Sequence, residues 1–99
     1  MTALPEIVAA LPRLKALRQD IHRHPELAFE ERRTAGIVAE RLRAAGIETH
    51  IGLATTGVVG VLRAGTSKRA IGLRADMDAL PILEQNPYPY RSQHTGTMH

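Results

Sequence analysis

The chain has 99 residues, of which 43% are hydrophobic and 23% charged, and its formal net charge is +3. This composition argues against a disordered polypeptide, and the length is sufficient for one small domain. No cysteine is present, so the sequence offers no disulfide framework. The N-terminus lacks a signal-peptide pattern, and no apolar run approaches the ~18–20 residues of a membrane span. We therefore expect a cytoplasmic protein without a membrane partner.

The basic residues are dispersed among acidic ones. Between residues 30 and 45, for example, acidic and basic side chains are interleaved: Glu30, Glu31 and Glu40 with Arg32, Arg33, Arg41 and Arg43. Interleaved signs are typical of a solvated helix face, whereas a nucleic-acid interface requires clustered positive charge. We expect no nucleic-acid partner.

The first predicted element is a helix that ends before Pro25. Its apolar residues recur at helical spacing on both sides of Pro12: Leu4, Ile7, Val8, Leu11, Leu14, Leu17 and Ile21. Proline removes an interior hydrogen bond, so the helix either kinks at Pro12 or restarts with Pro12 in its first turn. The residue before Pro25 resists helical geometry, which predicts the end of the helix.

A second helix is predicted over residues 30–45. Glu30 and Glu31 favour its positive N-terminal end, and Arg41 and Arg43 favour its negative C-terminal end. Gly46 fits the left-handed residue that ends many helices.

Three strands are predicted after Gly46. Residues 47–51 alternate between apolar and polar side chains, and residues 58–62 and 70–75 are short apolar runs. The order of two helices and then three strands indicates an α/β or α+β layer. From Leu80 to the end of the chain, prolines and small polar residues predict an irregular loop.

Two carboxylates, Asp76 and Asp78, follow the last predicted strand. Ligands gather outside the carboxyl ends of strands in open α/β sheets, and residues two apart project to the same side in extended geometry. Carboxylate oxygens can bind divalent metal ions directly, or they can hydrogen-bond to the side chains that do. The alternative is an ordinary turn in which one aspartate caps the next element.

The five histidines give a weaker signal. His22 and His24 lie near the end of the first helix, where a structural role is expected, and His50 is expected to be exposed on its strand. His94 and His99 lie in the final loop and could approach a metal site, but neither has a partner at a diagnostic metal-ligand spacing.

The glycines at Gly57 and Gly60 do not form a phosphate-binding loop, because no Gly-Lys-Ser/Thr follows them. Gly57 is expected to serve a turn, and Gly60 a close approach of backbone in the sheet.

Four segments together resemble the peptidase M20 amidohydrolases, which include hippurate hydrolases, N-acyl-amino-acid hydrolases and auxin-conjugate hydrolases. In the order and spacing of that family, they are His22–Glu31, Thr56–Gly60, Arg74–Pro81 and Gly96–His99. The similarity spans about residues 14–99. One such motif would be weak, and four in register are specific.

The resemblance implies a zinc-peptidase-like α/β/α catalytic domain, of which residues 1–99 would be the incomplete N-terminal portion. The rest of that domain and a smaller dimerisation domain would be absent, so a homo-oligomer is expected only for a full-length protein. The implied reaction is hydrolysis of the amide of a small N-acyl amino acid. Two divalent metal ions are implied, and manganese, zinc, cobalt and nickel are not distinguished.

The metal ligands and the general base implied by the resemblance all lie beyond His99, in a run that continues Ala-Cys-Gly-His-Asp-Gly-His in relatives. Within this chain the resemblance gives no metal ligand. It assigns Asp76 and Asp78 a supporting role beside the ligands, and it implies that the 99 residues alone are inactive. Leu83 stands where relatives often carry a polar residue, which leaves the substrate open.

Two other interpretations remain. The chain could be a small standalone module that binds polyanions through its net charge of +3, although its basic residues are dispersed and aromatics are scarce. It could also be an inert truncated remnant of the same ancestry.

Overall fold

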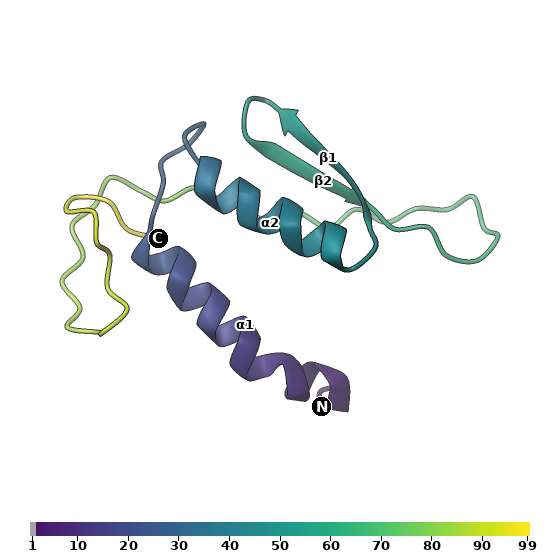
Figure 1. Ribbon diagram of the computed structural model, residues 1–99, viewed down its shortest axis with the longest axis horizontal. Helices are drawn as coiled ribbons and strands as arrows, with labels where there is room; N and C mark the ends of the chain where they lie inside the picture. Colours follow the sequence, from purple (N-terminus) through teal and green to yellow (C-terminus); the bar gives the residue numbers. More distant parts are fainter. Residues whose placement is uncertain (1) are drawn as a thin grey trace. The chain divides into compact units, whose positions relative to one another are not determined.

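A computed structural model describes residues 2–99, in which two helices are followed by two strands. In chain order these are α1 (Pro5–Arg23), α2 (Arg32–Ala44), β1 (Glu48–Leu53) and β2 (Gly57–Val61) (Figure 1). The chain divides into two compact units. One consists of α1 with residues 80–99, and the other consists of residues 26–79, which contain α2 and both strands. The combination of helices and sheet confirms the predicted α/β class.

Helix α1 runs without interruption past its internal proline. Pro5 occupies the start of the helix, where its missing N–H leaves no bond unmade. At Pro12 the predicted restart is wrong, because a single helix spans both sides of it. The carbonyl of Val8 loses its helical partner there, but Val8 is exposed and water can take that place. Pro25 follows the end of the helix, as predicted.

The start of α2 is capped by a carboxylate from outside the helix. Glu26 accepts hydrogen bonds from the backbone N–H groups of Arg33 and Thr34, at 2.9 and 2.7 Å, and from the Thr34 hydroxyl at 2.7 Å. The first N–H groups of a helix have no partner within it, so this carboxylate satisfies two of them. Burial raises the pKa of Glu26, but the hydrogen bonds from Thr34 and Arg33 outweigh it and hold that pKa below its ordinary value.

The end of α2 has the predicted glycine. Gly46 has a φ of +74°, and its N–H donates to the carbonyl of Arg43 at 2.9 Å. The N–H of Ile47 donates to the carbonyl of Leu42 at 3.0 Å, which satisfies another terminal carbonyl. The helix is shorter than the predicted span of residues 30–45, starting two residues later and ending one residue earlier.

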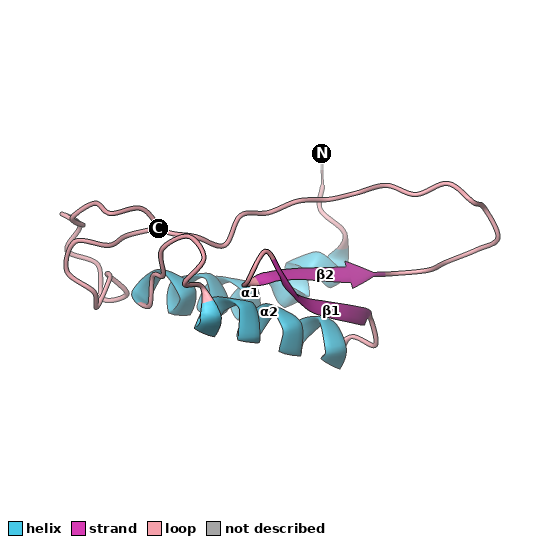
Figure 2. Cartoon of the chain, turned by 90° about the horizontal axis from the view of Figure 1, so that it is seen from above, coloured by secondary structure: helices cyan, strands magenta, loops and turns pink. Residues whose placement is uncertain are grey.

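Strands β1 and β2 form an antiparallel hairpin that packs along α2 (Figures 1 and 2). Glu48 pairs with Val61, and an irregularity lies between Ile51 and Leu53. A Cβ atom on Gly60 would lie 3.1–3.3 Å from side-chain atoms of Ile47 and Leu42. A close approach at Gly60 is therefore present, but it is made by side chains, one of them from α2, and not by backbone in the sheet as predicted.

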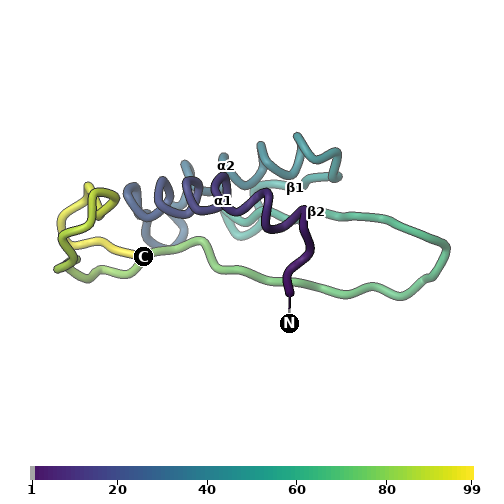
Figure 3. The backbone as a smooth tube through the Cα atoms, turned by 90° about the horizontal axis from the view of Figure 1, so that it is seen from below, coloured from purple at the N-terminus to yellow at the C-terminus, as the bar shows by residue number. Residues whose placement is uncertain are grey.

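The third predicted strand, residues 70–75, is wrong. This segment carries no strand among the described residues, and the trace after β2 runs as an extended irregular excursion (Figures 2 and 3). Ile71 and Leu73 are 88% and 91% exposed. A strand is defined by pairing with a neighbour, and no described residue pairs with this segment.

Residues 80–99 form the predicted irregular loop. Its two ends meet at an antiparallel bridge, in which Leu80 and Met98 exchange N–H···O=C bonds of 2.9 and 3.0 Å. The N–H of Gln93 donates to the carbonyl of Arg23, at the end of α1, at 2.9 Å. Within residues 2–99, neither helix has the length and apolar content needed to span a bilayer.

Candidate functional site

The two predicted site carboxylates lie on the irregular segment that precedes Leu80. Asp76 is exposed and forms an ion pair of 2.7 Å with Arg74, and this hydrogen bond raises the pKa of Arg74. Asp78 is half-buried. The N–H of the next residue, Ala79, donates to the carbonyl of Glu26 at 2.7 Å, and Ala79 is 3% exposed. The backbone on the C-terminal side of Asp78 is therefore fixed to the segment that caps α2.

Asp76 and Asp78 line an open hollow of about 570 Å³ in the unit formed by residues 26–79. Three stretches of the chain line it: residues 28–31, 53–59 and 73–78. Each stretch overlaps one of the four motifs that resemble the family. A third carboxylate, Glu31, also lines the hollow, and Arg74 is the one cationic side chain among the lining residues. The motifs thus share one concave surface with an excess of negative charge.

Glu31 is the most buried of these carboxylates, at 8% exposure. Its Oε2 atom accepts a hydrogen bond of 3.3 Å from the Thr56 hydroxyl, and its Oε1 atom has no hydrogen-bond partner among the described residues. This contact ties the start of α2 to the turn before β2. An unsatisfied buried acceptor is unfavourable by roughly 1–3 kcal/mol, so Glu31 is a costly group in this position.

Two walls of the hollow contain left-handed backbone at residues other than glycine. Phe29 and Ala54 line the hollow with φ values of 65° and 47°, and Thr55 beside it has 78°. For such residues the left-handed conformation costs about 1–2 kcal/mol each. Backbone strain of this kind gathers at functional sites, where surrounding contacts maintain it.

Metal-binding side chains are not gathered into one site in the described part of the chain. Among residues 2–99, no group of three or more His, Cys, Asp or Glu side chains lies where it could hold a metal ion. Asp76, Asp78 and Glu31 line one hollow, but they are not grouped closely enough to provide such a coordination sphere. No step of a reaction can therefore be assigned to a metal held by these residues.

His22 contacts Glu84, and three further histidines also have structural contacts. His24 Nδ1 lies 3.0 Å from the carbonyl oxygen of Asp20 near the end of α1, in agreement with the structural role expected for His24. His50 is exposed and hydrogen-bonds to Glu48, as expected for the polar side of β1. The ring of His94 lies 6.5 Å from that of His24, in an edge-on arrangement.

Sequence reasoning missed two carboxylates that the structure makes prominent, Glu26 and Glu84. Glu26 caps α2, and Glu84 is 4% exposed and contacts His22 from a distance of 62 residues in sequence. No helix-start pattern marks Glu26, because it lies outside α2, seven and eight residues before the amides that it caps. No local pattern marks Glu84, because its partners come from other parts of the chain.

Individual proteins of known name match this chain over 85–100% of its length. A comparison with models of whole protein families gave no match. A hippurate hydrolase from Campylobacter jejuni is 46% identical over 99 residues, covering 100% of this chain and 26% of that protein. An N-acyl-L-amino acid amidohydrolase from Geobacillus stearothermophilus is 41% identical over 87 residues, covering 85% of this chain and 23% of that protein.

A solved structure agrees with these relatives. A dinuclear metal binding peptidase from the M20 family, from Bacillus subtilis, superposes with a TM-score of 0.85 at 39% identity. The match covers 92% of this chain and 26% of that one, so the chain spans about a quarter of the length of its relatives. In sequence and in backbone, the chain matches part of an M20-type amidohydrolase, the family that its motifs resemble.

Proposed function

We propose that the chain is the N-terminal portion of the catalytic domain of a metal-dependent amidohydrolase that cleaves the amide bond of N-acyl amino acids. The observation that carries this proposal is the 46% identity with a hippurate hydrolase over all 99 residues. Similarity that includes four separate motifs in register is more specific than a match of fold, which alone does not imply an activity.

In this proposal the 99 residues have no activity by themselves. No group of three or more His, Cys, Asp or Glu side chains suited to a metal ion is found among residues 2–99, and the chain corresponds to 26% of the hippurate hydrolase. The ligands of two divalent metal ions, and the base that activates water, would come from sequence outside this chain. Such metal ions supply a water of lowered pKa and polarise the amide carbonyl.

Asp76 and Asp78 have a supporting role in this proposal. Both line the hollow that also contains Glu31, and the backbone beside Asp78 is anchored to Glu26. Carboxylates next to metal ligands orient those ligands through hydrogen bonds, and their removal typically lowers metal affinity or activity by about 10–100-fold. The substrate would be a small N-acyl amino acid in the cytoplasm, and any homo-oligomer would belong to the longer protein.

A side-by-side hydrolysis assay tests this proposal. The 99-residue chain and a form that includes the sequence following His99 in its gene are purified identically and given N-benzoylglycine and other N-acyl amino acids. Manganese, zinc, cobalt or nickel is added to each. We expect metal-dependent hydrolysis by the longer form alone.

Two other results contradict the proposal in different ways. Hydrolysis by the short chain would place the chemistry within these residues, and Asp76→Asn and Asp78→Asn would then be tested there. No hydrolysis by a folded, metal-loaded longer form would remove the proposed activity.

A further inference from the structure

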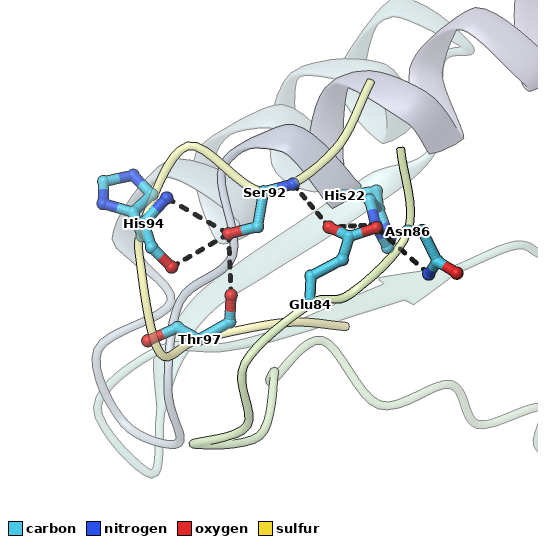
Figure 4. Close-up of polar contacts among 6 residues, drawn as sticks. All are labelled: His22, Glu84, Asn86, Ser92, His94 and Thr97. Carbon is cyan, nitrogen blue, oxygen red and sulfur yellow. Dashed lines mark hydrogen bonds and ion pairs between the residues drawn. The ribbon is translucent and has the colours of Figure 1, made fainter. Parts of the chain in front are cut away.

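Glu84 is a buried carboxylate in a loop whose neighbouring side chains are exposed. It is 4% exposed, whereas Ile82 and Leu83 on the same loop are 42% and 59% exposed. A carboxylate at this depth requires hydrogen-bond donors, because transfer from water without them is strongly unfavourable. Figure 4 shows that donors surround it.

Three donors from separate parts of one unit converge on Glu84. The backbone N–H of Ser92 donates to Oε1 at 2.6 Å, and Asn86 donates to Oε2 at 3.3 Å (Figure 4). His22, on α1, places Nε2 at 3.1 and 3.0 Å from the two oxygens. The backbone bond from Ser92 is the main reason that the pKa of Glu84 lies below its ordinary value. One side chain thus joins α1 to both arms of the loop.

Ser92 extends this network to the end of the chain. Its hydroxyl accepts from the N–H of His94 at 3.1 Å and lies 2.7 Å from the carbonyl of Thr97 and 3.0 Å from that of His94 (Figure 4). A hydroxyl has one hydrogen, so it donates to one carbonyl at a time. The next residue after Thr97, Met98, is bridged to Leu80. Glu84 is therefore connected through Ser92 to Thr97, which lies beside the residue that is bridged to Leu80.

One aromatic ring of the loop contacts His22. Tyr90 meets the His22 ring edge-on at 5.8 Å and stacks on Tyr88 at 5.1 Å. The guanidinium of Arg18 lies 5.8 Å from the Tyr90 ring. Both tyrosines of the chain thus lie on this loop, and Tyr90 links it to His22 and Arg18 of α1.

We propose that Glu84 is a positioning residue, which fixes the path of residues 80–99 on α1 and thereby sets where the chain continues after His99. This inference rests on the proposed function, in which the sequence that follows His99 carries the catalytic machinery. Glu84 itself touches no reacting group. Its effect is exerted through Ser92, whose amide and hydroxyl connect it to Thr97.

Hydrogen exchange of the protein encoded by the complete gene tests the inference without reference to activity. Glu84→Gln keeps the shape of the side chain but replaces one acceptor oxygen with a donor. We expect exchange of the Ser92, Gln93 and Met98 amides to accelerate at least about tenfold, with the amides of α2 unchanged. Glu6→Gln, an exposed carboxylate in the first turn of α1, is the matched control and is expected to change neither set.

A second pair of variants separates the contact from general damage to α1. His22→Gln retains an N–H donor near the position of Nε2, and His22→Leu does not. We expect slow exchange of Ser92 in the first variant and fast exchange in the second. Acceleration that spreads equally to α2 and the hairpin would overturn the inference, as would wild-type exchange rates in Glu84→Gln.

Kinetics of the longer protein complete the test. If it hydrolyses N-acyl amino acids, Glu84→Gln is expected to lower kcat at least about tenfold while KM changes less than about threefold. Unchanged kcat together with a mobile loop would overturn the positioning role. If the wild-type protein has no hydrolytic activity, the proposed function fails, and hydrogen exchange still decides whether Glu84 fixes the loop.

Discussion

Two neighbouring stretches of this chain differ in structure although both contain apolar runs. Residues 48–61 form a hydrogen-bonded hairpin, and residues 62–75 have no strand. Val58 is half-buried and Val59 is 42% exposed in the hairpin, whereas Leu73 in the second stretch is 91% exposed. The difference teaches that apolar content marks a segment able to form a strand, while a partner decides whether it does.

The largest effect is expected at the glycine that closes the hairpin. A Cβ atom on Gly57 would collide with the carbonyl oxygen of Leu53, whereas a Cβ atom on Gly72 would meet nothing within 4 Å. Gly57→Ala is expected to lower the free energy of unfolding by about 1–3 kcal/mol, because the turn backbone must shift. Gly72→Ala is expected to be neutral or to stabilise by at most about 1 kcal/mol. Denaturant unfolding compares the two, and equal losses would contradict the distinction between the stretches.

The next effect concerns the helix on which the hairpin packs. The carboxylate of Glu26 accepts three hydrogen bonds at the start of α2, and Glu26→Gln removes its charge and replaces one acceptor oxygen with an NH2 group. We expect a loss of about 1–2 kcal/mol in the free energy of unfolding. Glu30→Gln, at an exposed residue nearby, serves as the control in the same unfolding experiment. An equal loss of unfolding free energy in Glu30→Gln would show that removing any negative charge near the start of α2 has this effect, and that the hydrogen bonds of Glu26 are not its cause.

The same cap gives a pH dependence with a defined sign. The pKa of Glu26 is lowered in the folded chain, so the folded state binds its proton less readily than the unfolded state does. The stability it contributes is fully present above its unfolded pKa of about 4.3. That stability is lost as the pH falls through the lower pKa of the folded chain. We expect the difference in unfolding free energy between wild type and Glu26→Gln to shrink below about pH 4.3, and a constant difference would contradict this.

The smallest effect on stability is expected in the second stretch. Ile71→Thr with Leu73→Thr should change the free energy of unfolding by less than about 0.5 kcal/mol, because both side chains are almost fully exposed. The same change should reduce association at high concentration, since an unpaired apolar segment invites pairing between chains. Sedimentation velocity measures this. Leu83→Thr, in another exposed loop, is the control, and an equal reduction there would mean that pairing of the extended segment is not responsible.

Features specified by local sequence were predictable. The arginines near the end of α2 and Gly46 after it placed the end of that helix within one residue. Gly57 directly follows the turn of residues 54–56, as expected, and a Cβ atom there would collide with the carbonyl oxygen of Leu53. In each case the deciding neighbours are close in sequence, so the pattern contains the information.

Features that depend on distant partners were not predictable in the same way. Residues 70–75 read as a strand because their composition suits one, but composition does not provide the neighbour. Glu84 is separated by 62 residues from His22, and nothing in its own segment indicates burial. Asp76 and Asp78 are brought to one hollow with Glu31, while their supporting role in hydrolysis stays a prediction.

The irregular stretch after β2 also bears on how long the chain would survive in contact with proteases. Arg63, Lys68, Arg69 and Arg74 all lie exposed on it. Backbone that lacks ladder hydrogen bonds can enter a protease cleft without prior unfolding. A trypsin-like enzyme would therefore cut here first and separate the helix-and-hairpin segment from the Asp76–Asp78 motif. The lifetime of the intact chain would then be set by these few peptide bonds and not by the stability of its regular elements.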